Sequence, residues 1–304
     1  MVPSTARRSS ARWVEGVKRA VAAAQIEMRQ TLRALIHDNR LMNRERIDAE
    51  GYIVSEADLG NVQPDFEHVP KTAAELLLEG FGSRLHSGYV YGSVVRGNAV
   101  PRRSDVDVVA VLKAAPTDED RDAAGRVAQA IQERCPVLLG AGVGLTHVDE
   151  VLSAEERYGG QVFLRELCVC ICGEDLRPGL PRTKPGPAVA AGFHRDTPAV
   201  LARARSELAG STDPEVIRRA CRVASRRMVQ AAFAVVMARD GVWATVLEEQ
   251  AAAVGKAFPE WAEAARRAAE QGRQPVADAR VVAELLSTFG CWVEQALDHV
   301  MTGS

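Results

Sequence analysis

Two aspartates separated by one residue are the side chains of this sequence best suited to chemistry. Asp105 and Asp107 open a run rich in β-branched residues, Val106 to Leu112, which is typical of a buried strand. Residues two apart on a strand point to the same side, so both carboxylates are expected at one point in space. Two clustered carboxylates repel each other unless a cation lies between them. The pair therefore predicts a site for Mg²⁺ or Mn²⁺, with Asp105 and Asp107 as metal ligands and catalytic residues.

A second set of residues, just before this strand, is suited to binding phosphate. Gly92 has no Cβ and lets the backbone approach an anion, and Ser93 offers a hydroxyl and an N–H at the expected start of a helix. Arg96 is expected one turn further on, and Ser104 directly precedes Asp105. We expect these four residues to bind the phosphates of a nucleotide.

The segment from Tyr91 to Val111 combines these residues in the expected order strand, turn, helix start, strand. It resembles the polymerase-β-type nucleotidyltransferase superfamily, whose signature is Gly-Ser and, about a dozen residues later, Asp-x-Asp. The patterns GSxxRG from Gly92 and SDxD from Ser104 are most similar to the small bacterial branch that includes aminoglycoside nucleotidyltransferases. The resemblance is strong over residues 87–112 and continues more weakly to Leu176.

The resemblance implies a reaction and roles for the residues that match the motif. ATP or another NTP would bind with Mg²⁺, an acceptor hydroxyl would attack the α-phosphate, and pyrophosphate would leave. Gly92 and Ser93 would hold the β- and γ-phosphates, while Asp105 and Asp107 would hold the metal. The expected enzyme is adenylyltransferase-like and modifies a small hydroxylated molecule.

The sequence departs from the family at a third carboxylate, which a later strand usually supplies. On the predicted strand Val143 to Val148, Gly144 occupies that position. Glu150 has the same parity and is our predicted third catalytic residue, although it lies beyond the predicted strand; Asp149 has the opposite parity. A base from the helical half, Glu248 or Glu249, is an alternative. A third interpretation is a weakened site that binds nucleotide without turnover, as in a regulatory or scaffold protein.

The alternation of predicted helices and strands indicates an α/β domain with a small mixed sheet, followed by an all-α helical bundle domain. The proline- and glycine-rich stretch Arg177 to Pro187 separates them, so we expect domains at 1–180 and 181–304. The first domain includes an N-terminal helical extension. Strands are predicted at 89–91, 106–112, 143–148 and 167–172, and helices at 11–46, 72–86, 118–134, 197–209, 213–239, 243–256, 259–271 and 277–301.

The helical half is expected to supply the acceptor pocket, because such sites form between domains. Its candidate polar groups are Arg219, Arg222, Arg226, Glu248, Glu249 and Glu260. The arginines between 218 and 227 form either a solvated face or a site for phosphate or an acidic acceptor. No dense acidic cluster suits a polycationic aminoglycoside. A transferase acting on protein or RNA is a further alternative, which an open cleft lined by these arginines would favour.

Composition and charge narrow the classes of protein to which this sequence could belong. The formal net charge of −2 argues against a general nucleic-acid or membrane binder, and no apolar run is long enough to span a membrane. The alternating Cys168, Cys170 and Cys172 are expected to be buried small apolar side chains in a reducing compartment, so we expect a cytoplasmic protein. The apolar stripe of the predicted N-terminal helix allows a homodimer.

Overall fold

Four strands pair into one mixed sheet in the computed structural model, which describes residues 46–302. The order across the sheet is β3-β2-β1-β4. β1 runs antiparallel to β2 and β4, and β2 runs parallel to β3. The strands are β1 (Leu85–Tyr91), β2 (Val106–Leu112), β3 (Ala141–His147) and β4 (Cys168–Gly173).

The alternation of side chains along β2 divides the α/β half into two layers of core. Val106, Val108, Ala110 and Leu112 face the core formed with α2 (Val69–Phe81) and α3 (Asp118–Arg134). Val109 and Val111 face the opposite core, which includes Leu164 of α5 (Gly160–Leu167) and Val151 of α4 (Val148–Val151). Asp107 has the parity of Val109, so its carboxylate lies on the α5 side of the sheet.

The helices that cover the sheet show which local signals fix a helix end. α3 has the predicted bounds, and a capping box between Thr117 and Asp120 begins it. The helix predicted to begin at Thr72 begins three residues earlier: α2 starts after His68, with a proline in its first turn. α2 also ends before residue 86, because Gly82 leaves the helix with φ +50°.

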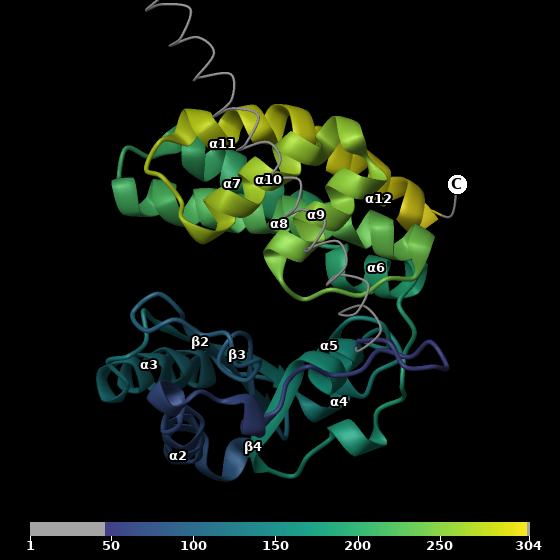
Figure 1. The fold of residues 1–304 in the computed structure, drawn as a ribbon. Coiled ribbons are helices and arrows are strands. Elements are labelled where there is room, and N and C mark those ends of the chain that lie inside the picture. The colour runs from purple at the N-terminus through teal and green to yellow at the C-terminus, as the bar shows by residue number, and fades with distance from the viewer. Residues whose placement is uncertain (1–45, 303–304) are drawn as a thin grey trace, which may run out of the picture. The chain divides into compact units, whose positions relative to one another are not determined.

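A long helix, α8 (Pro214–Asp240), is at the centre of the helical half. The predicted start is confirmed, since Asp213 caps it by accepting from the N–H of Glu215, and Gly241 ends it in the left-handed conformation. Around α8 pack α6 (Pro187–His194), α7 (Thr197–Gly210), α9 (Leu247–Ala257), α10 (Ala262–Arg273), α11 (Ala279–Leu285) and α12 (Cys291–Thr302) (Figure 1).

Two predictions in this half needed correction, and one helix, α6, was missed. Residues 243–246 form a loop, so that α9 begins at Leu247. The helix predicted at 277–301 is interrupted by a π-helical turn, Leu286–Gly290, between α11 and α12. Short 3₁₀ turns lie at Leu59–Asn61, Pro64–Phe66, Gly82–Arg84, Arg177–Gly179 and Pro259–Trp261.

The fold class expected from the sequence is confirmed, with a small mixed sheet followed by packed helices. The boundary at residue 180 stays a prediction, and the helix predicted at 11–46, with the dimer it allows, lies outside the described residues. None of the helices between residues 46 and 302 is both long and apolar enough to cross a membrane.

Candidate functional site

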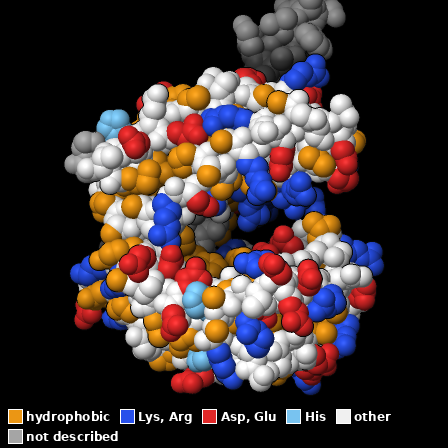
Figure 2. All heavy atoms as spheres, turned by 180° about the vertical axis from the view of Figure 1, so that it is seen from behind, with side chains coloured by type: hydrophobic (Ala, Val, Ile, Leu, Met, Phe, Trp, Pro, Cys, Tyr) orange, Lys and Arg blue, Asp and Glu red, His pale blue; other side chains and the backbone are white. Residues whose placement is uncertain are grey.

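A cleft of about 580 Å³ is lined by residues of both the sheet and the helical half. One wall is the loop between β1 and β2 with the strand ends beside it, and α8 and the loop after it form the other. Figure 2 shows this hollow, with the side chains of Lys and Arg gathered beside it. Of the predicted site residues, the cleft brings together Gly92, Ser93, Arg96, Ser104, Asp105 and Asp107.

The two aspartates lie at the start of β2 with unbalanced negative charge. The pKa of Asp107 is raised to about 6, chiefly by burial and also by the neighbouring Asp105, while Arg226 opposes the shift. Neither carboxylate accepts a hydrogen bond from any described residue. Two carboxylates crowded in this way suit a divalent cation. Between residues 46 and 302 no group of three or more His, Cys, Asp or Glu could hold a metal, so phosphate and water oxygens would have to complete its coordination.

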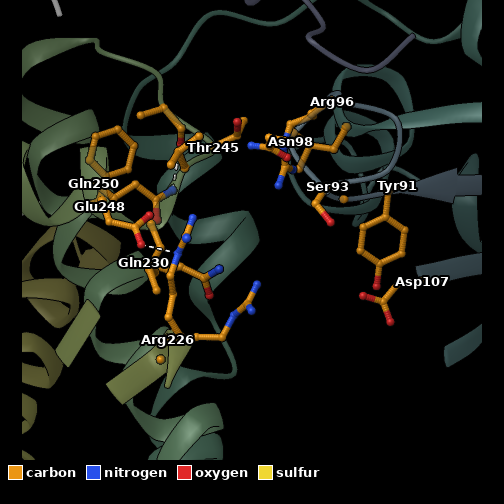
Figure 3. Close-up of a pocket in the computed structure, with 18 of the residues that line it drawn as sticks. Tyr91, Ser93, Arg96, Asn98, Asp107, Arg226, Gln230, Thr245, Glu248 and Gln250 are labelled. Atoms are coloured by element: carbon orange, nitrogen blue, oxygen red, sulfur yellow. Dashed lines mark hydrogen bonds and ion pairs between the residues drawn. The ribbon is translucent and has the colours of Figure 1, made fainter. Parts of the chain in front are cut away.

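The Gly92-Ser93 turn leaves open space beside its backbone. Gly92 has φ +90°, which favours glycine, and a Cβ built on it would meet no atom within 4 Å. The helix start predicted here is wrong: residues 93–97 form turns, in which Gly92 O accepts from Arg96 N and Ser93 O accepts from Asn98 N. The Ser93 hydroxyl faces the cleft (Figure 3) and has no hydrogen-bond partner among the described side chains.

Arg96 and Ser104 differ in how free they are to bind a ligand. Burial lowers the pKa of the Arg96 guanidinium, Glu56 opposes this, and Arg226 adds to it. The buried Nε of Arg96 has no hydrogen-bond partner, which a phosphate oxygen would supply. The Ser104 hydroxyl already accepts from Val100 N at 2.9 Å, so it closes the loop that leads into β2.

Glu150 lies outside the cleft. β3 ends at His147, and Glu150 follows on α4, where it is exposed and accepts from the Thr146 hydroxyl at 2.7 Å. The strand position next to Asp107 is Gly142 rather than Gly144, because β2 and β3 pair Asp107 with Gly142. A Cβ on Gly142 would come within 2.7 Å of Asp107 Oδ1. No acid on β3 therefore joins the pair.

The helical wall contributes three of its six predicted residues to the cleft. Arg222, Arg226 and Glu248 line it. Arg226 points from α8 toward the wall that carries Asp107 (Figure 3), and Glu248 forms an ion pair with Arg273. The other three are engaged or placed elsewhere: Arg219 faces Glu207, Glu249 pairs with Arg46, and Glu260 is on the surface turn before α10.

The comparisons with known proteins give a likeness of fold alone. No family model matches the sequence, and no curated protein matches it. Among solved structures, the chain is similar to spectinomycin adenyltransferase AAD(9) from Enterococcus faecialis, crystallised with ATP and spectinomycin. The TM-score is 0.43 and the sequence identity 15%, over 76% of this chain and 98% of that one. At this degree of similarity, the function has to be argued from the residues of the cleft.

Sequence reasoning missed the aromatic residues of the cleft. Tyr91 pairs with Asp107 across β1 and β2, and its ring meets that of Phe163 edge-on at 4.8 Å. Burial raises the pKa of Tyr91, and Asp107 raises it further, so the phenol is neutral beside the carboxylates. Phe233 and Met237 continue the cleft-facing stripe of α8. The spacing of this stripe was a readable signal, but an apolar stripe is more often core than cleft.

Proposed function

We propose that the cleft is the active site of a metal-dependent nucleotidyltransferase, which moves an NMP to a hydroxyl of a small molecule and releases pyrophosphate. With ATP as donor, the group moved is AMP. The observation that carries the proposal is that the two walls of the cleft face each other with complementary groups. Asp105, Asp107 and the open Gly92 turn lie on one wall, and Arg226 reaches toward them from the other.

In the proposed reaction the oxygen of the acceptor hydroxyl bonds to the α-phosphorus. The bond from the α-phosphorus to the bridging oxygen breaks, and pyrophosphate leaves. Asp105 and Asp107 would hold Mg²⁺ or Mn²⁺, which when bound offsets the charge of the phosphates and of the leaving oxygen. Gly92, Ser93 and Arg96 would position the β- and γ-phosphates, so that catalysis is mainly orientation and charge stabilisation.

The proton of the acceptor hydroxyl needs a base, and β3 does not supply one. Apart from Asp105 and Asp107, Glu248 is the carboxylate that lines the cleft in the described part of the chain. It is exposed in the first turn of α9, on the wall opposite the metal pair. Glu248 is therefore our candidate base, in place of Glu150.

A second function, nucleotide binding without turnover, is favoured by the lack of an acid on β3 beside the two aspartates. Gly142 stands beside Asp107, where a third carboxylate would have to lie. In this alternative the protein is regulatory or a scaffold, and the cleft binds NTP and metal without transfer. A protein or RNA acceptor is less well supported, because the arginines between 218 and 227 do not all line the cleft. Arg222, Arg226 and Arg227 line it, whereas Arg218 and Arg219 do not.

Pyrophosphate release distinguishes transfer from binding. The protein is incubated with ATP, Mg²⁺ and a deproteinised metabolite extract, and pyrophosphate is measured against Asp105→Asn/Asp107→Asn. We expect extract-dependent release by the wild type and at least a hundredfold less by the double variant. Binding of ATP with no release under any donor NTP would exclude the transferase and leave the binding protein.

A further inference from the structure

The face of α8 that lines the cleft changes from cationic to apolar along its length. Arg222, Arg226, Gln230, Phe233 and Met237 follow one another at helical spacing and all line the cleft. From Arg222 to Met237 this face extends roughly 22 Å at 1.5 Å per residue. The cleft therefore has two unlike ends beside α8, an arginine end at Arg222 and an apolar end at Met237.

The arginines of α8 differ in whether the protein neutralises them. Outside the cleft, Arg218 pairs with Glu215 and Arg219 faces Glu207. Arg222 and Arg226, which line the cleft, form no ion pair or hydrogen bond with any residue from 46 to 302. A cation left without a partner in a cleft attracts an anionic ligand.

Arg226 and Arg222 are separated by one helical turn and are placed for different groups. Arg226 points toward the wall that carries Asp107 (Figure 3), so we assign it to the metal pair and the triphosphate. Arg222 lines the same cleft one helical turn closer to the start of α8. Arg96 lies toward the other end of α8, because Glu56, which acts on it, is hydrogen-bonded to Thr245 in the loop after that helix. Arg222 is thus left for a ligand group other than the triphosphate.

The acids of the cleft leave no site for a cationic acceptor. Asp105 and Asp107 are assigned to the metal, and the charge of Glu248, the candidate base, is offset by Arg273. Arg103, on the opposite wall, adds another cation without a partner among the described residues. An amine entering this cleft would meet positive charge on both walls.

We propose that the acceptor is an anion, a hydroxylated small molecule bearing a phosphate or carboxylate that Arg222 holds. This inference rests on the proposed function, in which Arg96 positions the phosphates of the nucleotide, and it adds Arg226 to the nucleotide site. A guanidinium binds either oxyanion through paired N–H donors, which gives orientation as well as affinity. The anionic group at Arg222 would then fix the acceptor so that its hydroxyl reaches the α-phosphate.

The test is calorimetry on protein saturated with Mg²⁺ and a non-hydrolysable ATP analogue. Glucose 6-phosphate, glucose and glucosamine are titrated as probes that differ in charge. We expect glucose 6-phosphate to bind at least about tenfold more tightly than the other two. Arg222→Gln should weaken its binding by about tenfold or more, and Arg222→Lys should weaken it less. Arg218→Gln, one turn away and outside the cleft, should leave it unchanged.

Three results would overturn the inference while leaving the proposed function intact. They are equal or tighter binding of glucose or glucosamine, no binding of the sugar phosphate to the loaded protein, and the same loss in Arg218→Gln as in Arg222→Gln. If the ATP analogue itself fails to bind, the proposed function fails first and the inference falls with it.

Discussion

Keeping the Asp107 carboxylate ionised in the folded protein costs free energy. Its pKa rises from 3.8 to about 6, chiefly through burial. The folded protein therefore binds this proton more tightly than the unfolded chain does, and the stability this gives is full at low pH and lost as the pH rises through 6. A bound metal ion would offset the same cost, because it stabilises the ionised carboxylate.

Asp107→Asn should therefore stabilise the metal-free protein at pH 7.5. We expect the free energy of unfolding in urea to rise by roughly 1 to 3 kcal/mol at pH 7.5 and to change little near pH 4, where the wild-type group is protonated. Asp149→Asn, on exposed α4, is the control and should change neither value. A loss of stability in Asp107→Asn at pH 7.5 would contradict the electrostatic account.

The same pKa sets the pH dependence of metal-supported binding. Because a proton and Mg²⁺ compete for Asp107, the affinity for a Mg²⁺–ATP analogue should fall as the pH is lowered from 7 through about 6. Calorimetry between pH 5 and 8 measures it. Affinity that stays constant down to pH 5 would show that Asp107 takes no part.

At the scale of single residues, spacing predicted the site residues that lie within one short motif. It did not predict those that the fold brings to the site from distant parts of the sequence. Gly92, Asp105 and Asp107 follow from types and parity within one segment. Glu150 was chosen by extending that parity, which holds on a strand and not on the helix that begins after His147. Arg226 was one of several candidate arginines, and only the packing of α8 decides which of them face the cleft.

The register between two strands controls the space beside the metal pair. Gly142 stands opposite Asp107 on β3, and a Cβ there would come within 2.7 Å of Asp107 Oδ1. At Gly144, two residues on, a Cβ would meet nothing closer than 3.7 Å. The absence of a side chain at Gly142 thus lets Asp107 keep its position.

Gly142→Ala should displace the Asp107 carboxylate and weaken binding of the Mg²⁺–ATP analogue by about tenfold or more, since small misplacements of a catalytic group are costly. Gly144→Ala is the matched control on the same strand and should bind as the wild type does. Circular dichroism checks that both variants fold. Equal affinities in the two variants would mean that this register does not set the position of Asp107.

Elements with a complete local signal were predicted well, and those that depend on packing were not. α3 begins at the Thr117–Asp120 capping box and ends at Arg134, two residues before Pro136. The last predicted helix is interrupted at Leu286–Gly290, where the sequence has neither a proline nor a pair of glycines to predict the interruption. α6 directly follows a proline-rich linker and is short, so the composition of this region did not predict a helix.

A partly buried ion cluster joins the segment after residue 45 to the helical half. Arg46, whose side chain is 8% exposed, pairs with Glu56 and with Glu249 of α9. Glu56 also accepts from the Thr245 hydroxyl at 2.6 Å, and Thr245 lines the cleft. These residues are far apart in sequence, so no local pattern could have predicted the cluster.

Arg46→Met should leave two acids without their cation and lower the free energy of unfolding by roughly 2 to 4 kcal/mol, as measured in urea. Arg121→Met removes an exposed pair with Asp118 and should cost less than about 1 kcal/mol. Comparable losses in both variants would show that the cluster adds nothing beyond a surface ion pair.

At the scale of the whole molecule, we propose that the cleft between the sheet and the helices binds nucleotide through metal held by two aspartates. Calorimetric titration of a non-hydrolysable ATP analogue, with and without Mg²⁺, tests it directly on the wild type and on Asp105→Asn/Asp107→Asn. We expect binding that requires Mg²⁺ and is lost in the double variant. Binding that is indifferent to Mg²⁺ and to both aspartates, or no binding of any NTP analogue, would contradict it.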